Sequence, residues 1–102
     1  MHMTDKKGEK PDLDILTVIS SDEVRAAISA TLLPDNKCSP YARLKEDVEK
    51  RMGTKLTDGK FNWHLKQLVV GNVIHNHGKG NKGEYELTAR GRVAAEAIKN
   101  AL

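Results

Sequence analysis

The side chains with the most informative chemistry lie in a predicted helix over residues 58–70. Its apolar residues Phe61, Leu65, Leu68 and Val69 fall on one side of a helical wheel, which predicts a buried face. The other side is basic and polar and carries Gly59, Lys60, Trp63, Lys66, Gln67 and Val70, flanked by Asn62 and His64. Lysine donates to phosphate or guanine, and Asn and Gln amides pair with the edge of adenine, so this face is typical of a helix that enters the major groove of DNA.

The N-terminus and the tryptophan of this helix bear on the same hypothesis. Thr57 is the predicted N-cap, and Gly59 in the first turn lets the backbone come close to DNA, where free N–H groups favour a phosphate. Trp63 has two interpretations that the sequence leaves open, a contact with DNA or packing against another helix or a partner chain. For Asn62 and Lys66, the alternative to a DNA contact is a plain solvated helix face.

A second basic segment, residues 78–83, is rich in glycine and carries Lys79 and Lys82. It lacks the spacing and the following Ser or Thr of a phosphate-binding P-loop, so we reject that function. Because the segment lies between two predicted strands, we expect its glycines to form a hairpin tip from which the two lysines reach backbone phosphates. The alternative is an ordinary flexible loop.

The charge distribution supports an anionic partner. The formal net charge is +3, but residues 1–36 carry 4 basic and 7 acidic side chains, a net charge of −3, whereas residues 37–102 carry 13 basic and 7 acidic side chains, a net charge of +6. A basic half on an otherwise balanced chain indicates nucleic acid or another anionic surface. A solvated lysine-rich surface is the alternative.

Catalytic and metal chemistry has little support. His75 and His77 point to the same face of a predicted strand, but no cysteine is near, so we expect a polar face and no metal site. His64 is interpreted as a packing residue, and Cys38 as a half-buried loop thiol. A single cysteine excludes an internal disulfide. No nucleophile–base pair or carboxylate pair has a suitable local spacing, so we expect neither an enzyme nor a cofactor.

The 102 residues suffice for one domain, with 38% hydrophobic and 30% charged residues. We expect residues 1–11 to be a disordered tail and residues 12–102 to fold. Since only four residues are aromatic, the core must consist mainly of Leu, Ile, Val and Ala. No apolar run approaches a membrane span, and residues 1–11 contain no apolar stretch of a signal peptide, so we expect a cytoplasmic protein without a membrane partner.

Apolar spacing and capping signals predict the elements around these residues. One helix spans residues 12–19, with Leu13, Leu16 and Ile19 on one side. The next begins at Ser20, which forms a capping box with Glu23, and stops before Pro34. The remaining elements are a helix that opens at Ser39-Pro40 and ends at Gly53, the helix 58–70, strands 73–77 and 84–87, and a final helix capped by Thr88, with Val93, Ala94, Ala97, Ile98, Ala101 and Leu102 on one side.

The predicted order is α-α-α-α-β-β-α, which is mainly α with a small β-hairpin. Two helices joined by a short turn, followed at once by a hairpin, form a winged helix-turn-helix. In this fold, residues 57–70 are the recognition helix and residues 73–87 are the wing.

Three segments of the chain resemble prokaryotic winged helix-turn-helix regulators of the ArsR/MarR-like class. Residues 56–68, Leu-Thr-Asp-Gly-Lys-Phe-Asn-Trp-His-Leu-Lys-Gln-Leu, are similar to their recognition helix. Residues 19–28 are similar to their opening helix, and Tyr85-x-Leu87-Thr88-x-x-Gly91-Arg92 is similar to the end of their wing. Together these motifs cover about residues 13–102 in the family's order.

The resemblance implies a cytoplasmic homodimer, joined by terminal helices, that binds an inverted repeat in double-stranded DNA. It places Gly59, Lys60, Asn62, Trp63 and Lys66 in the major groove and Lys79 and Lys82 at the wing tip. The chain departs from the family in two places. The cysteine pair of the metal-sensing members is missing, and Val69-Val70-Gly71-Asn72 replaces the usual Glu-Glu-Ala-Gly, which exposes apolar surface for a partner.

We therefore predict a sequence-specific regulator of transcription that binds double-stranded DNA. The predicted DNA-binding residues are Thr57, Gly59, Lys60, Asn62, Trp63, Lys66, Gln67, Lys79 and Lys82. Two alternatives remain open: a winged-helix protein-interaction module without specific DNA binding, and a ligand- or metal-responsive switch.

Overall fold

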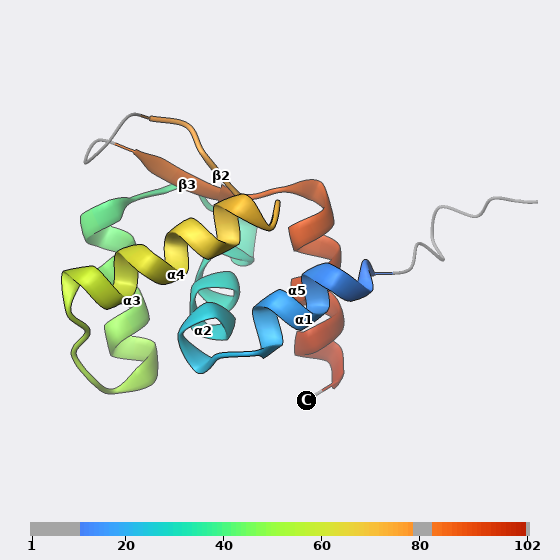
Figure 1. Cartoon of the computed structure of the whole chain (residues 1–102), viewed down its shortest axis with the longest axis horizontal. Helices are drawn as coiled ribbons and strands as arrows, with labels where there is room; N and C mark the ends of the chain where they lie inside the picture. The colour runs from blue at the N-terminus through green and yellow to red at the C-terminus, as the bar shows by residue number, and fades with distance from the viewer. Residues whose placement is uncertain (1–10, 79–82, 102) are drawn as a thin grey trace, which may run out of the picture.

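The computed structural model describes residues 11–78 and 83–101, which form five α-helices and a small antiparallel sheet (Figure 1). The elements are α1 (Leu13–Ser20), α2 (Glu23–Leu32), the 3₁₀ turn η2 (Pro34–Asn36), β1 (Ser39–Pro40), α3 (Tyr41–Met52), α4 (Asp58–Val70), β2 (Ile74–Asn76), β3 (Glu84–Leu87) and α5 (Ala89–Ala101). This confirms a mainly α fold with a β-hairpin. Lys79 and Lys82 lie outside the described residues.

The sheet has three strands in the described part of the chain, in the order β1-β3-β2. Strand β1 was missed from the sequence, where Ser39-Pro40 was expected to cap and open the third helix. Instead Ser39 pairs with Tyr85 and Pro40 with Glu84, and α3 begins at Tyr41. Proline is tolerated because β1 is an edge strand, where a missing N–H leaves no ladder bond unmade.

Most predicted helix ends are confirmed by their capping contacts. The Thr57 hydroxyl accepts from the Lys60 N–H at 3.1 Å, and Gly53 ends α3 in the left-handed region with φ of 74°. The expected capping box at Ser20 is wrong. Asp22 caps α2 instead, because its carboxylate accepts from the Val24 N–H at 2.7 Å, while Ser20 remains in α1 and donates to the Leu16 carbonyl.

Helix α2 lies at the centre of the molecule and packs against every other helix, with α4 in front of it in Figure 1. The largest fully buried side chains come mainly from four helices, α1 to α4, and from β2, and they include Ile19, Ile28, Leu32, Leu44, Phe61, Leu68 and Ile74. The predicted core side of α1 is partly wrong. Leu13 is 76% exposed, and Ile15 takes the buried position because α1 turns that side toward α2 and α5.

Helix α5 is joined tightly to the base of the hairpin. The Thr88 hydroxyl accepts from the Gly91 N–H at 2.8 Å, as predicted for an N-cap, and donates to the Asn72 carbonyl at 2.8 Å. A Cβ at Gly91 would lie 2.1 Å from the Val73 carbonyl oxygen. Only glycine therefore allows α5 to start this close to β2, so α5 and the hairpin hold a fixed relative position.

Candidate nucleic-acid interface

A network of polar side chains fixes the start of α4 against α3. Tyr41 donates to the Asp58 carboxylate at 2.9 Å, and the Lys45 ammonium lies 3.4 Å from the same carboxylate. Glu49 accepts from the Leu56 N–H at 2.7 Å, which holds the turn between the two helices. The hydrogen bond from Tyr41 lowers the pKa of Asp58, so this carboxylate stays ionised, and burial together with Asp58 raises the pKa of Tyr41 to about 12.

The exposed side of α4 carries all the DNA-binding residues predicted for this helix. Gly59, Lys60, Asn62 and Lys66 are exposed, as is Thr57 at the N-cap, and Gln67 is half-buried. Trp63 is 54% exposed. The structure therefore brings these side chains together on one solvent-facing helix at the front of the molecule (Figure 1).

The predicted buried side of α4 is wrong at one position. Val69 is 38% exposed, and His64 is buried beside Phe61, Leu65 and Leu68. His64 is therefore a packing residue, as expected, but its polar partners come from α2. Its Nδ1 accepts from the Arg25 Nε at 3.1 Å, and its Nε2 lies 3.6 Å from the Asp22 carboxylate. Burial lowers the pKa of His64, and Arg25 and Lys60 act in the same direction against Asp22.

Arg25 is a residue of this site that the sequence analysis missed. Its guanidinium lies 5.2 Å from the centre of the Trp63 ring, and it also donates to the Ser21 hydroxyl at 3.1 Å. The edge of the Trp63 ring also meets His64, with ring centroids 4.9 Å apart. One face of the indole therefore rests on protein while more than half of the residue is open to solvent. Both interpretations of Trp63, a packing residue and a DNA contact, remain compatible with this geometry.

A groove of about 410 Å³ separates α4 from the hairpin. Asn62, Lys66 and Val69 line one side, and Asn76 and Tyr85 line the other. Asn76 also accepts from the Gly78 N–H at 3.1 Å, which shapes the strand end. Asn62 and Lys66 therefore lie across this groove from Asn76, the last residue of β2.

His75 of β2 and His77, just after this strand, lie close together, and His77 has an acidic partner. The His75 and His77 rings share a face with centroids 5.5 Å apart, and His77 Nε2 lies 2.6 Å from the Glu86 carboxylate. Cys38 is exposed, which corrects the expected half-buried thiol, and its Sγ lies 3.6 Å from Glu84. Residual burial and Glu84 raise the pKa of Cys38. Within residues 11–78 and 83–101, no three His, Cys, Asp or Glu side chains gather as a metal site.

Helix α5 buries only part of the apolar side that the sequence predicts for it. Ala94 is fully buried and Ala95 nearly so, because α5 packs these residues against its own core. Ala94 is therefore not available to a second chain, whereas Ala97 is half-buried and Ala101 is exposed. No helix in the described part of the chain is both long and apolar enough to cross a membrane.

No known relative provides a comparison for the geometry of this interface. Comparisons of the chain with protein-family models, with curated proteins and with solved structures found no match in any of the three.

Proposed function

We propose that the chain is a winged-helix regulator of transcription that binds double-stranded DNA in a sequence-specific manner. The observation that carries the proposal is the exposed face of α4, where Lys60, Asn62, Trp63 and Lys66 lie on one rigid, capped helix. In this function α4 enters the major groove and the hairpin, residues 73–87, lies over flanking phosphates.

The arrangement of elements supports the winged-helix part of the proposal. Helices α3 and α4 are joined by a short turn, and the hairpin follows α4 directly. Strand β1, which precedes α3, completes the sheet on the far side of β3. The β1 pairing anchors the hairpin to the helix pair, so the wing and α4 would meet DNA as one body. The proposal includes membership of the ArsR/MarR-like class of prokaryotic regulators.

The side chains of α4 divide into two chemical groups. The amide of Asn62 can form a paired contact with adenine, and Lys66 can donate to guanine. Lys60 in the first turn, next to the free N–H groups of the helix start, suits a backbone phosphate. Asp58 would repel that phosphate, but Lys45 and Tyr41 partly compensate its charge.

A homodimer on an inverted repeat is part of the proposal, with the terminal helices as its contact. Ala94 of α5 is buried in the protein's own core and cannot take part in this contact, but Leu13 is 76% exposed on α1, which packs against α5. In a two-fold dimer of this kind, the two α4 helices would occupy half-sites about 34 Å apart. We propose no catalytic activity, no cofactor and a cytoplasmic location.

A protein-interaction module is the second candidate function. It is favoured by the exposed apolar surface of α4, where Val70 is 77% and Trp63 is 54% exposed. An aromatic residue of this kind is typical of the centre of a protein interface. Trp63→Ala separates the two functions. A loss of DNA affinity supports the regulator, and intact DNA binding with a lost protein contact supports the module.

A salt titration with random duplex DNA tests the proposal at its first step. Fluorescence anisotropy at two salt concentrations should show binding that weakens steeply as salt rises, because lysines displace counterions from phosphates. Lys60→Ala should reduce the slope of log K against log salt by about one unit. Lys50→Ala, on the exposed side of α3, is the matched control and should leave the slope unchanged. No binding at low salt would overturn the regulator in favour of the interaction module.

A further inference from the structure

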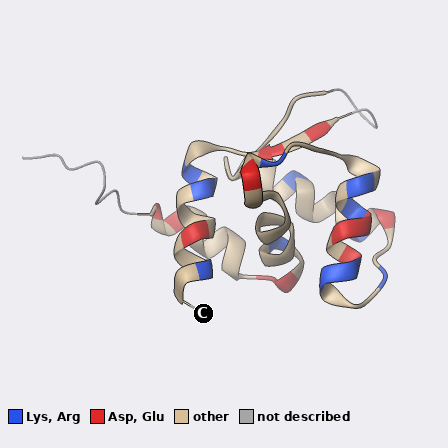
Figure 2. Cartoon of the chain, turned by 180° about the vertical axis from the view of Figure 1, so that it is seen from behind, with Lys and Arg blue, Asp and Glu red and all other residues tan. Residues whose placement is uncertain are grey.

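A second surface of the molecule, on the face opposite α4, is a groove of about 420 Å³. Figure 2 shows this face, with α2 in the middle between α5 and α3. The groove is lined by residues from these three helices, including Ala26 and Ala30 of α2, Leu33 at its C-cap, and Ala95 and Ile98 of α5. It shares no lining residue with the groove between α4 and the hairpin.

Helix α2 is apolar on the side that forms the floor of this groove as well as on its buried side. Val24, Ile28 and Leu32 are buried in the core, whereas Ala26 and Ala30 are only half-buried. A helix that is apolar on two sides is normally covered on both. The small side chains of Ala26 and Ala30 leave room for another helix to approach the α2 backbone closely.

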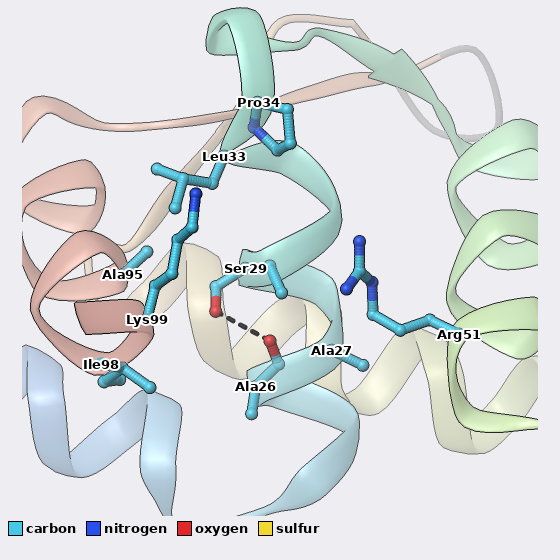
Figure 3. A pocket seen from close by; sticks show the side chains of 10 residues that line it. Ala26, Ala27, Ser29, Leu33, Pro34, Arg51, Ala95, Ile98 and Lys99 are labelled. Atoms are coloured by element: carbon cyan, nitrogen blue, oxygen red, sulfur yellow. Dashed lines mark hydrogen bonds between the residues drawn. The ribbon is translucent and has the colours of Figure 1, made fainter. Parts of the chain in front are cut away.

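The charged residues that line the groove are both basic. Figure 3 shows Lys99 extending from α5 on one side of α2 and Arg51 from α3 on the other. Arg51 donates through Nε to the Thr31 hydroxyl at 3.1 Å, which fixes the position of its guanidinium. Among the residues that the structure describes, no Asp or Glu lines the groove. An occupant therefore needs an apolar face between acidic flanks.

Two possible occupants from this chain fit poorly. Residues 1–10 contain only two apolar side chains, Met1 and Met3, and five of the other eight residues are charged, three lysines against one aspartate and one glutamate. A second copy that docked by a two-fold contact would place the same surface on both sides. Lys99 and Arg51 of one copy would then face the same basic pair of the other, which is repulsive.

We propose that this groove docks an acidic amphipathic helix of a partner protein. The docking follows the general mode in which a helix lays its apolar face into a groove, here with its carboxylates on Lys99 and Arg51. The ten residues of α2 span about 15 Å, which accommodates roughly three turns of a partner helix. Because α4 lies on the opposite face, the partner leaves the proposed DNA contact free.

Peptide selection tests the class of partner directly. A displayed library of helical peptides is selected on the full-length chain and depleted on Ala30→Trp, which fills the groove. Circular dichroism of this variant checks that it is folded. The enriched peptides should carry apolar residues at i, i+3 or i+4 and i+7, flanked by Asp or Glu. Enrichment of neutral or basic peptides overturns the proposal. It is equally overturned if every enriched peptide binds the wild type and Ala30→Trp alike.

Affinity measurements on an enriched peptide test the role of charge. Lys99→Glu should weaken its binding roughly tenfold, because one ion pair is lost and a repulsion replaces it. Lys55→Glu, an exposed residue outside the groove, should leave the affinity unchanged. Equal losses in both variants would refute docking at this groove. DNA affinity should be the same in the presence and absence of the peptide, so failure here is distinct from failure of the proposed function.

Sedimentation of the wild type and of Ala30→Trp tests the second copy as occupant. The proposal expects the two proteins to have the same oligomeric state. A dimer that becomes a monomer on Ala30→Trp substitution would show that a second copy fills the groove and would overturn the partner helix.

Discussion

Acidification below pH 6.5 should destabilise the chain through His64. Its ring is buried, and its Nδ1 accepts a hydrogen bond from Arg25, so the folded state favours the neutral form of the imidazole. Protonation at Nδ1 would remove this acceptor and bring two positive charges together. Burial therefore lowers the pKa of His64 from its ordinary value of 6.5, mainly through desolvation.

The sign and size of the effect follow from proton linkage. Below pH 6.5 the unfolded chain binds a proton at His64 that the folded chain does not, so the free energy of unfolding falls as the pH falls. The loss levels off once the pH passes the lowered pKa of the folded state. The contribution of His64 between pH 6.5 and pH 5.5 is at most about 1 kcal/mol, or a Tm decrease of about 5 °C for a chain of this size.

Thermal unfolding followed by circular dichroism between pH 7.5 and pH 5 measures this effect. His64→Gln retains an amide beside Arg25 but cannot titrate, so its Tm should fall less than that of the wild type on acidification. His75→Gln, at an exposed position on β2, is the matched control and should follow the wild type. Parallel curves for the wild type and His64→Gln would refute the reasoning.

Three further predictions concern two glycines, Gly91 and Gly59, the amide of Asn62, and the two lysines Lys79 and Lys82. In urea denaturation, Gly91→Ala should cost roughly 3 kcal/mol of unfolding free energy, because the new Cβ would meet a backbone carbonyl. Gly59→Ala should instead stabilise α4 by about 0.5–1 kcal/mol, because the new Cβ would meet no neighbouring atom within 4 Å. If Gly59→Ala nevertheless weakens DNA binding, the close approach of α4 to DNA is supported, and unchanged binding would contradict it. Asn62→Ala should cost about 1–3 kcal/mol on a preferred site and little on random DNA, and a uniform loss on both would assign Asn62 to phosphate. Lys79→Ala and Lys82→Ala should each weaken anisotropy-measured binding to all sequences and lower the salt slope by about one unit, and an altered sequence preference would mean that the wing reads bases.

Local signals in the sequence predicted the helices well. The apolar spacing of α3 and α4, the cap at Thr57 and the stop at Gly53 all depend on residues within one or two turns of each other, so they are visible without the fold. Helix α4 has the predicted bounds, from Asp58 to Val70.

Long-range contacts account for the errors. Ser39-Pro40 has the local appearance of a helix start, but its pairing with Tyr85 and Glu84 lies more than 40 residues away in the sequence. The exposure of Val69 is a second error, because His64, expected to pack, takes the more buried position with Asp22 and Arg25, at the start of α2, as its partners. A helical wheel ranks Val69 above His64 for burial by hydrophobicity alone. The wheel does not show that hydrogen bonds to α2 allow the polar imidazole ring to be buried in the core.

Selection of binding sites from a pool of random duplex DNA tests the central claim most directly. The wild-type chain should enrich a defined sequence, and the preference should be altered by Asn62→Ala and Lys66→Ala on the exposed face of α4. Lys50→Ala on α3 should enrich the same sequence as the wild type. If the wild type enriches no sequence, or if the α4 variants enrich an unchanged one, α4 does not read DNA and the account is contradicted.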